Sequence, residues 1–236
     1  MDTNTAFLHD HVPRFPVPYD ILPPMSIQSY ISASYALILD ACLKQEMVSA
    51  VCGILILNQV IKTELLTKFL WDDGIFAGLR VVPLLNKLLS IRFAPDEDPF
   101  AVQECYRIGA ILYLAGIRSR FGVDLSTRVY ITKLKMIMTA QNFISKMNYS
   151  ILLWVVLIGG VQSYNMPAHN WFVSATVDLV IKREGLTWDE LMVIVREVLW
   201  IEGLFEAECC EFRKEVSAEL WRLHHFMLSR QFASNC

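Results

Sequence analysis

The sequence predicts an all-α fold, a single multi-helix bundle of about eight to ten helices behind an extended, proline-rich N-terminal arm. Three observations support this prediction. From Ser26 onward, apolar residues recur at three- and four-residue spacing, and no alternating strand pattern extends over any length. Short turn signals separate these runs, and several of them carry helix-capping residues. The 236 residues, 54% of them hydrophobic, are enough to bury one core without disulfides or metals.

The N-terminal arm is predicted from its prolines. Five of the nine prolines fall within one short stretch: Pro13, Pro16, Pro18, Pro23 and Pro24. Proline fixes φ and removes a backbone hydrogen-bond donor, so such a stretch does not continue a helix. We therefore expect residues 1–25 to form an extended arm and residues 26–236 to form the helical domain.

The first helices are delimited by turn signals. In chain order these are Asp72 to Gly74, which end one helix, the solvated turn APDEDP at residues 94–99, and residues 122–126, which lead into another helix. The later run Ile151–Ile158 (ILLWVVLI) is apolar on all sides. A helix of this kind is surrounded by other helices, so we expect it at the centre of the bundle.

The C-terminal helices carry capping signals. Pro167 suits the first turn of a helix, where its missing N–H would have been unpaired. Gly185 is predicted to be the glycine that follows that helix in the left-handed conformation. Thr187 and Glu190 form a T-x-x-E capping box. The helix that follows has one apolar stripe, made of Leu191, Ile194, Val195, Val198 and Leu199.

Charge and hydropathy exclude several classes of protein. The net charge of -3 and the sequence pI near 6.0 provide no basic surface for a nucleic-acid backbone, so we expect no autonomous DNA binding. The mean hydropathy is +0.39, but the longest apolar run, Ile151–Val161, is shorter than the roughly 18 residues of a spanning helix. We expect no membrane span. The segment MDTNTAFLHDH lacks the features of a secretory signal, and the six scattered cysteines fit reduced thiols, which favours a cytoplasmic or nuclear location.

Residues 151–216 carry a family resemblance. The matching stretches are LLWVVLIGG (Leu152 to Gly160), NWFVSATVDLVIKREGL (Asn170 to Leu186), TWDELMVIVREVLWIEGLFE (Thr187 to Glu206) and, upstream, YRIGAILYLAGIRSRFG (Tyr106 to Gly122). They lie within residues 106–216, about half of the chain, and this region resembles the fungal-specific transcription factor domain, the C-terminal helical regulatory region of fungal zinc-cluster transcription factors. The resemblance implies an α-helical scaffold that regulates or dimerises.

The zinc cluster that usually accompanies this region has no counterpart in the sequence. That cluster needs six closely spaced cysteines, whereas this chain has no C-x2-C pair, and Cys209 and Cys210 are adjacent. We therefore expect a stand-alone module without a DNA-binding domain.

Asp72 and Asp73 are candidate catalytic residues. Adjacent carboxylates in LWDDGIF could bind a divalent metal through oxygen, as an aspartate motif of the class I terpene cyclase type does. The alternative is a solvated helix-ending turn, which we favour because no second carboxylate motif at a matching helix spacing completes the site. We expect no metal and no cofactor.

His169, Trp154 and Trp171 are the other candidate site residues. His169 could act as an acid or base near neutral pH, although a surface residue at a helix start is the more common role. The many aromatic side chains pack mainly in the core, but they could also enclose an apolar ligand cavity, with Trp154 and Trp171 as the candidate ligand-binding residues.

A second metal-binding candidate lies near the C-terminus, where Glu206, Glu208, Cys209, Cys210 and Glu211 are followed by His224 and His225. Neighbouring cysteines on a helix diverge by about 100°, so the two thiols do not converge on one ion. We favour a charged helix with buried thiols.

Two functions remain open at this point. The first is a regulatory or interaction module that binds a second copy of the chain or a zinc-cluster transcription factor. The second is a small enzyme of fungal specialised metabolism, a cyclase or isomerase that folds an apolar terpenoid or polyketide intermediate in a cavity. We favour the first, because the residues that match a family are scaffold residues and none matches a catalytic pattern.

Overall fold

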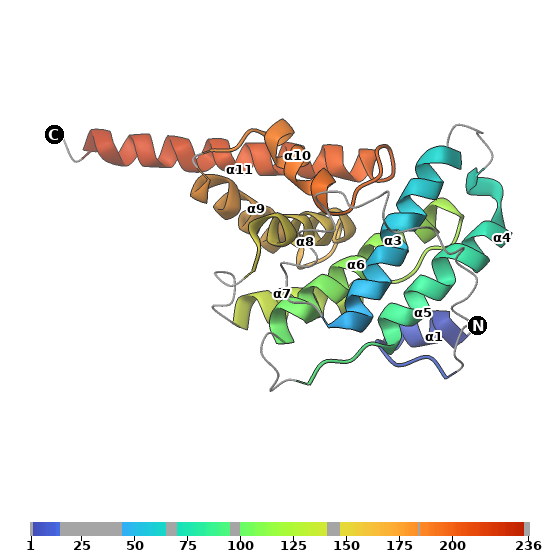
Figure 1. Cartoon of the computed structure of the whole chain (residues 1–236). Helices are drawn as coiled ribbons and strands as arrows, with labels where there is room; N and C mark the ends of the chain where they lie inside the picture. The colour runs from blue at the N-terminus through green and yellow to red at the C-terminus, as the bar shows by residue number, and fades with distance from the viewer. Residues whose placement is uncertain are drawn as a thin grey trace.

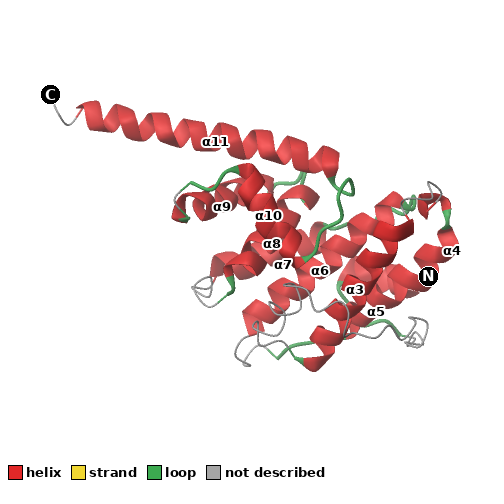
Figure 2. Ribbon diagram, turned by 45° about the horizontal axis from the view of Figure 1, so that its top comes forward, coloured by secondary structure: helices red, strands yellow, loops and turns green. Residues whose placement is uncertain are grey.

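The structure is a computed structural model that describes residues 2–14, 44–64, 70–94, 100–140, 147–183 and 185–233. All regular secondary structure in these ranges is helical (Figure 2). The predicted all-α, multi-helix fold is therefore confirmed.

The helices follow one another along the chain, as Figure 1 shows. They are α1 (Asp2–His9), α3 (Gln45–Glu64), the 3-10 turn η4 (Leu70–Asp72), α4 (Gly74–Phe76), the π-helical turn η5 (Ala77–Val81), α5 (Val82–Ser90), α6 (Phe100–Arg120), α7 (Arg128–Ala140), α8 (Tyr149–Gln162), α9 (His169–Lys182), α10 (Trp188–Val198) and α11 (Glu206–Ala233).

Two buried helices, α6 and α8, form the centre of the bundle. Every residue from Ala101 to Arg118 in α6 and from Ile151 to Val161 in α8 is buried. The two helices cross where Gly109 lies against Trp154, and a Cβ atom at residue 109 would be 2.8 Å from the indole ring. Glycine therefore permits this close approach, and the predicted central helix at Ile151–Ile158 is confirmed.

The other helices cover this centre on two sides. Helices α9 and α10 pack against α8, and α11 lies across α9 and α8. On the other side, α3, α5 and α7 pack against α6, while α1 packs against α5. Figures 1 and 2 both show the C-terminal part of α11 extending beyond the rest of the bundle.

The local capping predictions can be compared with the structure. Thr187 and Glu190 form the predicted capping box, in which the Glu190 N–H donates to Thr187 Oγ1 and the Thr187 N–H donates to Glu190 Oε2. Gly185 has the predicted positive φ, at 82°, but it lies beyond the Arg183 cap of α9. Pro167 was expected inside a helix; it lies instead in the turn before α9, which begins at His169.

The prediction of an extended N-terminal arm is wrong for residues 2–9, which form α1. The reason is tertiary, because Phe7 is fully buried and its carbonyl accepts a hydrogen bond of 2.7 Å from Tyr130 Oη. Pro13 is buried, and the rest of the predicted proline-rich arm, residues 15–25, lies outside the described residues.

A buried ionic cluster fixes the end of α1 to the bundle; it comprises Asp10, Glu104, Arg107 and Lys133. The guanidinium of Arg107 is fully buried and donates two hydrogen bonds of 2.8 Å to Glu104, and it also donates to both carboxylate oxygens of Asp10. Lys133 Nζ lies 2.7 Å from Asp10 and 2.8 Å from Glu104. Each carboxylate therefore meets two cations of the cluster, and Asp10 also lies 3.8 Å from Arg92, which offsets the cost of burial.

Helix α3 is the helix in the described part of the chain that is long and apolar enough to cross a membrane. Half of its most apolar window is buried within the bundle, where α3 contacts α5 and α6. Core helices commonly meet the same criteria of length and composition. The absence of a membrane span stays a prediction.

A polar cleft as the candidate functional site

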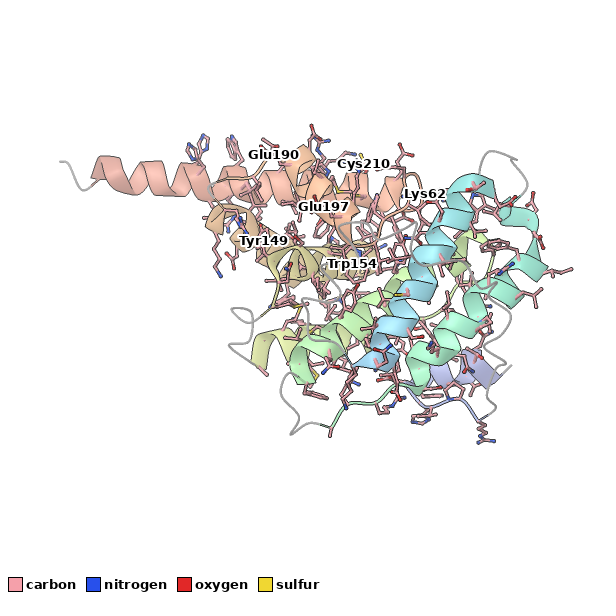
Figure 3. All side chains as sticks on the ribbon, viewed as in Figure 1. Lys62, Tyr149, Trp154, Glu190, Glu197 and Cys210 are labelled. Carbon is pink, nitrogen blue, oxygen red and sulfur yellow. The ribbon has the colours of Figure 1, made fainter. Side chains whose placement is uncertain are left out.

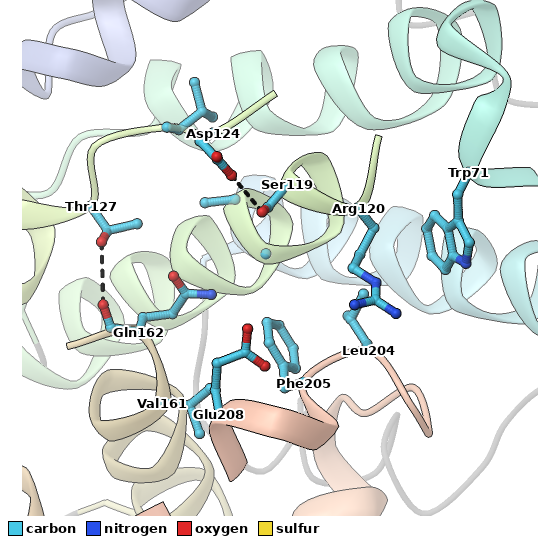
Figure 4. A pocket seen from close by; sticks show the side chains of 13 residues that line it. Trp71, Ser119, Arg120, Asp124, Thr127, Val161, Gln162, Leu204, Phe205 and Glu208 are labelled. Atoms are coloured by element: carbon cyan, nitrogen blue, oxygen red, sulfur yellow. Dashed lines mark hydrogen bonds between the residues drawn. The ribbon is translucent and has the colours of Figure 1, made fainter. Parts of the chain in front are cut away.

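An open cleft of about 420 Å³ lies where α6 and α8 end and α11 begins (Figure 4). Its lining residues come from segments that are distant in the sequence: Trp71, Ala115, Gly116, Ser119, Arg120, Asp124, Leu125, Thr127, Val161, Gln162, Leu204, Phe205 and Glu208. The volume falls within the range of roughly 300–1,000 Å³ that is common for small-molecule sites.

Glycine at residue 116 shapes the floor of the cleft. A Cβ atom there would lie 2.0 Å from the Phe205 ring and 2.8 Å from Gln162 Nε2. The absence of a side chain therefore lets the ring and the amide rest on the last turn of α6. Tyr113 and Trp200 contact the other sides of the Phe205 ring and hold it in place.

Two hydrogen bonds within the lining fix the loop between α6 and α7. Ser119 Oγ donates to Asp124 Oδ1 at 2.5 Å, and Thr127 Oγ1 donates to the carbonyl of Gln162 at 3.4 Å (Figure 4). This hydrogen bond between Ser119 and Asp124 joins the last turn of α6 to the loop that follows it.

Three other polar side chains in the cleft are not engaged in this way. The side chains of Arg120, Gln162 and Glu208 form no hydrogen bond or ion pair with any residue that the structure describes. Arg120 does contact an aromatic ring, because its guanidinium carbon is 5.9 Å from the ring centroid of Trp71. A cation, an amide and a carboxylate are thus available to a ligand in one cleft.

The candidate residues Asp72 and Asp73 lie outside this cleft. Asp72 closes the turn η4, and Asp73 begins α4, where its Oδ1 accepts hydrogen bonds of 3.0 Å from the N–H groups of Ile75 and Phe76. Both aspartates are exposed, so the solvated turn that we favoured has its counterpart in the structure. Asp73 is committed to capping, although it starts a helix instead of ending one.

His169 is not the surface residue that we favoured. Its ring is buried between Tyr164 and Phe212, with Nδ1 3.1 Å from Ser163 Oγ and Nε2 2.7 Å from Glu215 Oε2. A serine, a histidine and a carboxylate in a row are used in nucleophilic catalysis. Here, however, Ser163 is fully buried and its hydroxyl also lies 2.9 Å from the Gly160 carbonyl. The row links the ends of α8 and α9 to α11 and serves packing.

The two candidate tryptophans have different environments. Trp154 is fully buried inside the bundle, where its Nε1 donates a hydrogen bond of 2.7 Å to the carbonyl of Leu199 (Figure 3). It is a core residue and does not line the cleft. Trp171 is half-buried and lines a groove of about 150 Å³ between α7, α8 and α9, with Asp178 and Lys182 on its rim. The structure does not bring the two side chains to one pocket.

The second metal-binding candidate is spread along α11. Cys209 is buried, Cys210 is exposed on the outer side of the helix (Figure 3), and His224 lies about 20 Å further along. Burial raises the pKa of the Cys209 thiol to about 11, so this thiol remains protonated near neutral pH. In the described part of the chain, no three His, Cys, Asp or Glu side chains are placed to hold a metal ion.

Sequence reasoning did not identify the cleft, although it named Glu208 as a possible metal ligand. The useful signal was the position of Arg120 and Gln162 as the last residues of two apolar helices, because a polar side chain at the end of a buried helix lies at the edge of the core. Comparisons of the chain with family models, with curated proteins and with solved structures found no match.

Proposed function

We propose that this chain is a stand-alone helical regulatory module of the fungal transcription factor type, which acts by binding a second copy of itself. The contact is anchored on the C-terminal half of α11, which lies beside the first half of the same helix in the other copy. The exposure of Trp221 on that helix is the observation that carries this proposal, since 65% of the side chain is accessible.

The apolar stripe of α11 supports a partner at its C-terminal half. In the first half of the helix, Cys209, Phe212 and Val216 are buried against the bundle. Further along, Leu220 and Leu223 are only partly buried, and Trp221 faces outward. Tryptophan is among the residues that most often dominate the binding energy of protein interfaces, and the partly buried leucines beside it would add apolar area.

Helix stability provides a second argument. The C-terminal part of α11 extends away from the other described helices (Figure 2). An isolated helix shorter than about 12–15 residues is marginal in water. Pairing with another helix would bury its apolar side chains and stabilise it.

The charges on α11 favour an antiparallel pair. Its first half is rich in acids: Glu206, Glu208, Glu211, Glu215 and Glu219. Its second half, from residue 220 onward, has no acid but contains Arg222, His224, His225 and Arg230. When two copies run antiparallel, the basic half of each helix lies beside the acidic half of the other, which aligns the pair.

A zinc-cluster transcription factor with a similar helical region would present a similar surface, so it is the heteromeric version of the same proposal. The cyclase or isomerase alternative has less support. It expects acids that converge in an apolar cavity, whereas Asp73 caps a helix, His169 is enclosed by packing, and the cleft has polar side chains.

The substitution Trp221→Glu tests the homodimer. We expect the wild-type chain to dimerise with an affinity that falls as ionic strength rises, because the complementary charges are exposed. Trp221→Glu should weaken the dimer by about 2 kcal/mol or more, which is roughly thirtyfold. Sedimentation equilibrium at several protein and salt concentrations measures both effects.

Met136 provides the matched control, because it is also 65% exposed but lies on α7. Met136→Glu should leave the dimer affinity unchanged. A wild-type chain that remains monomeric, or a dimer that both substitutions weaken equally, would contradict the proposal.

A further inference from the structure

We propose that the polar cleft binds a free α-amino acid with an apolar or aromatic side chain, so that the module also senses a small molecule. This inference goes beyond the proposed function. The cleft lies at the start of α11, about 20 Å along the helix from Trp221, so ligand binding and dimerisation can be measured separately.

Arg120 selects the carboxylate of the ligand. Its guanidinium carbon lies 5.9 Å from the centroid of the Trp71 ring, and the group has no carboxylate partner among the described residues. A planar guanidinium matches a carboxylate through two parallel hydrogen bonds. Asp124 forms no ion pair with Arg120, and its Oδ1 accepts a hydrogen bond from Ser119 Oγ.

Glu208 and Gln162 select the ammonium group. Glu208 has only acceptor oxygens when ionised, and the side-chain amide oxygen of Gln162 is a further acceptor in the same cleft. Figure 4 shows both side chains on the side of the Phe205 ring away from Arg120. Helix α8 ends at Gln162, and the negative end of its dipole favours a positive charge there. Opposite charges on the two sides of the cleft therefore match a zwitterion.

The apolar part of the lining selects the side chain of the ligand. Phe205, Leu204 and Leu125 provide the apolar surface between the charged groups. Because Gly116 has no side chain, the Phe205 ring rests on α6 and leaves the space above it open. A ring or a branched chain on the ligand would stack there and exclude water from the charged contacts.

Three related compounds test the inference by isothermal titration calorimetry on the full chain. L-Phenylalanine carries both charges, N-acetyl-L-phenylalanine lacks the ammonium, and L-phenylalaninamide lacks the carboxylate. We expect L-phenylalanine to bind, and each derivative to bind about three- to fivefold more weakly, because each lacks one of the two charged groups that pair with the exposed Arg120 and Glu208.

Two substitutions identify the residues responsible. Arg120→Met should abolish the preference for phenylalanine over the amide, and Glu208→Gln should abolish the preference over the N-acetyl derivative. Arg213→Met and Glu206→Gln are the matched controls. Arg213 lies over Trp188 as Arg120 lies over Trp71, and Glu206 is in the same helical turn as Glu208, but neither lines the cleft. Both controls should retain both preferences.

The inference is overturned if wild-type protein binds none of the three compounds at millimolar concentration, or if it binds all three equally. It is also overturned if both preferences persist in Arg120→Met and Glu208→Gln. The Trp221→Glu variant should bind L-phenylalanine as wild type does, which separates this result from any failure of the dimer.

Discussion

At the scale of single residues, the closest contacts in the bundle are between glycines and aromatic rings. Gly159 and Gly160 are adjacent on α8 but face different helices, because a Cβ at Gly159 would meet Phe172 of α9 and one at Gly160 would meet Phe212 of α11. The predicted central helix therefore depends on two missing side chains as well as on its apolar ones.

Gly160→Ala should destabilise the protein, because the new Cβ would lie 2.3 Å from ring carbons of the fully buried Phe212. Overpacking of this kind costs about 1–3 kcal/mol. Urea unfolding monitored by circular dichroism measures the loss, and the added substitution Phe212→Leu should restore part of it. Gly78→Ala is the control, since its Cβ would meet no atom within 4 Å and should not lower stability.

Single-residue environments were the hardest to predict from sequence. We favoured a surface position for His169 because the sequence around it reads as a helix start. In the structure the ring is buried and lies within hydrogen-bond distance of Ser163, six residues earlier, and of Glu215, 46 residues later. No local spacing indicates the second contact, because the position of α11 over α9 determines it.

At the scale of elements, local chemistry is sufficient for some helices and insufficient for α1. The capping box of α10, the turn at Asp72 and Asp73 and the apolar helix α8 all depend on residues within about four positions of one another, and a sequence displays such spacing directly. Helix α1 was missed because its stability comes from Tyr130 and Arg107, which are far away in the sequence.

The capping box can be tested by Thr187→Ala, which removes the acceptor for the Glu190 N–H and should lower the free energy of unfolding by about 1 kcal/mol. Thr187→Ser keeps the hydroxyl and should preserve nearly all of the stability. Chemical denaturation of both variants gives the comparison. Equal losses in the two would mean that the hydroxyl does not cap α10.

At the scale of the whole molecule, the ionic cluster makes stability depend on pH. Burial alone would raise the pKa of Asp10 and of Glu104, but the positive charges and hydrogen bonds of Arg107 and Lys133 hold both pKa values below their ordinary 3.8 and 4.5. Carboxylates with a lowered pKa in the folded state stabilise it fully above their unfolded pKa values. This contribution is lost as the pH falls through the lower, folded values.

We therefore expect the contribution of Asp10 and Glu104 to the free energy of unfolding to be constant above about pH 5 and to decline below about pH 4. Asp10→Asn should cost about 3 kcal/mol at neutral pH, because Arg107 loses a buried partner, and should make the acid decline shallower. Thermal unfolding between pH 3 and pH 7 measures both. The exposed pair of Glu211 and Lys214 gives the control Glu211→Gln, which should change stability little at any pH.

The cleft belongs to this largest scale, which explains why sequence reasoning did not find it. Its residues come from η4, α6, α8, α11 and the loops that follow α6 and precede α11, and no motif links them. Fold class depends on a repeating pattern that any window of the chain displays, whereas this site depends on where three helix ends meet. The fold class can therefore be predicted from one sequence, whereas the cleft can be found only once the helices are packed.

The ionic cluster also constrains the order of assembly. Helix α1 is synthesised before the residues that hold it, because Arg107 and Lys133 follow Asp10 by 97 and 123 residues. A nascent chain that ends before Lys133 carries the carboxylates of Asp10 and Glu104 with only one of their two cations in the cluster. Helix α1 therefore docks fully only once α7 has been made, and until then the surface that receives α1 stays open to other helices.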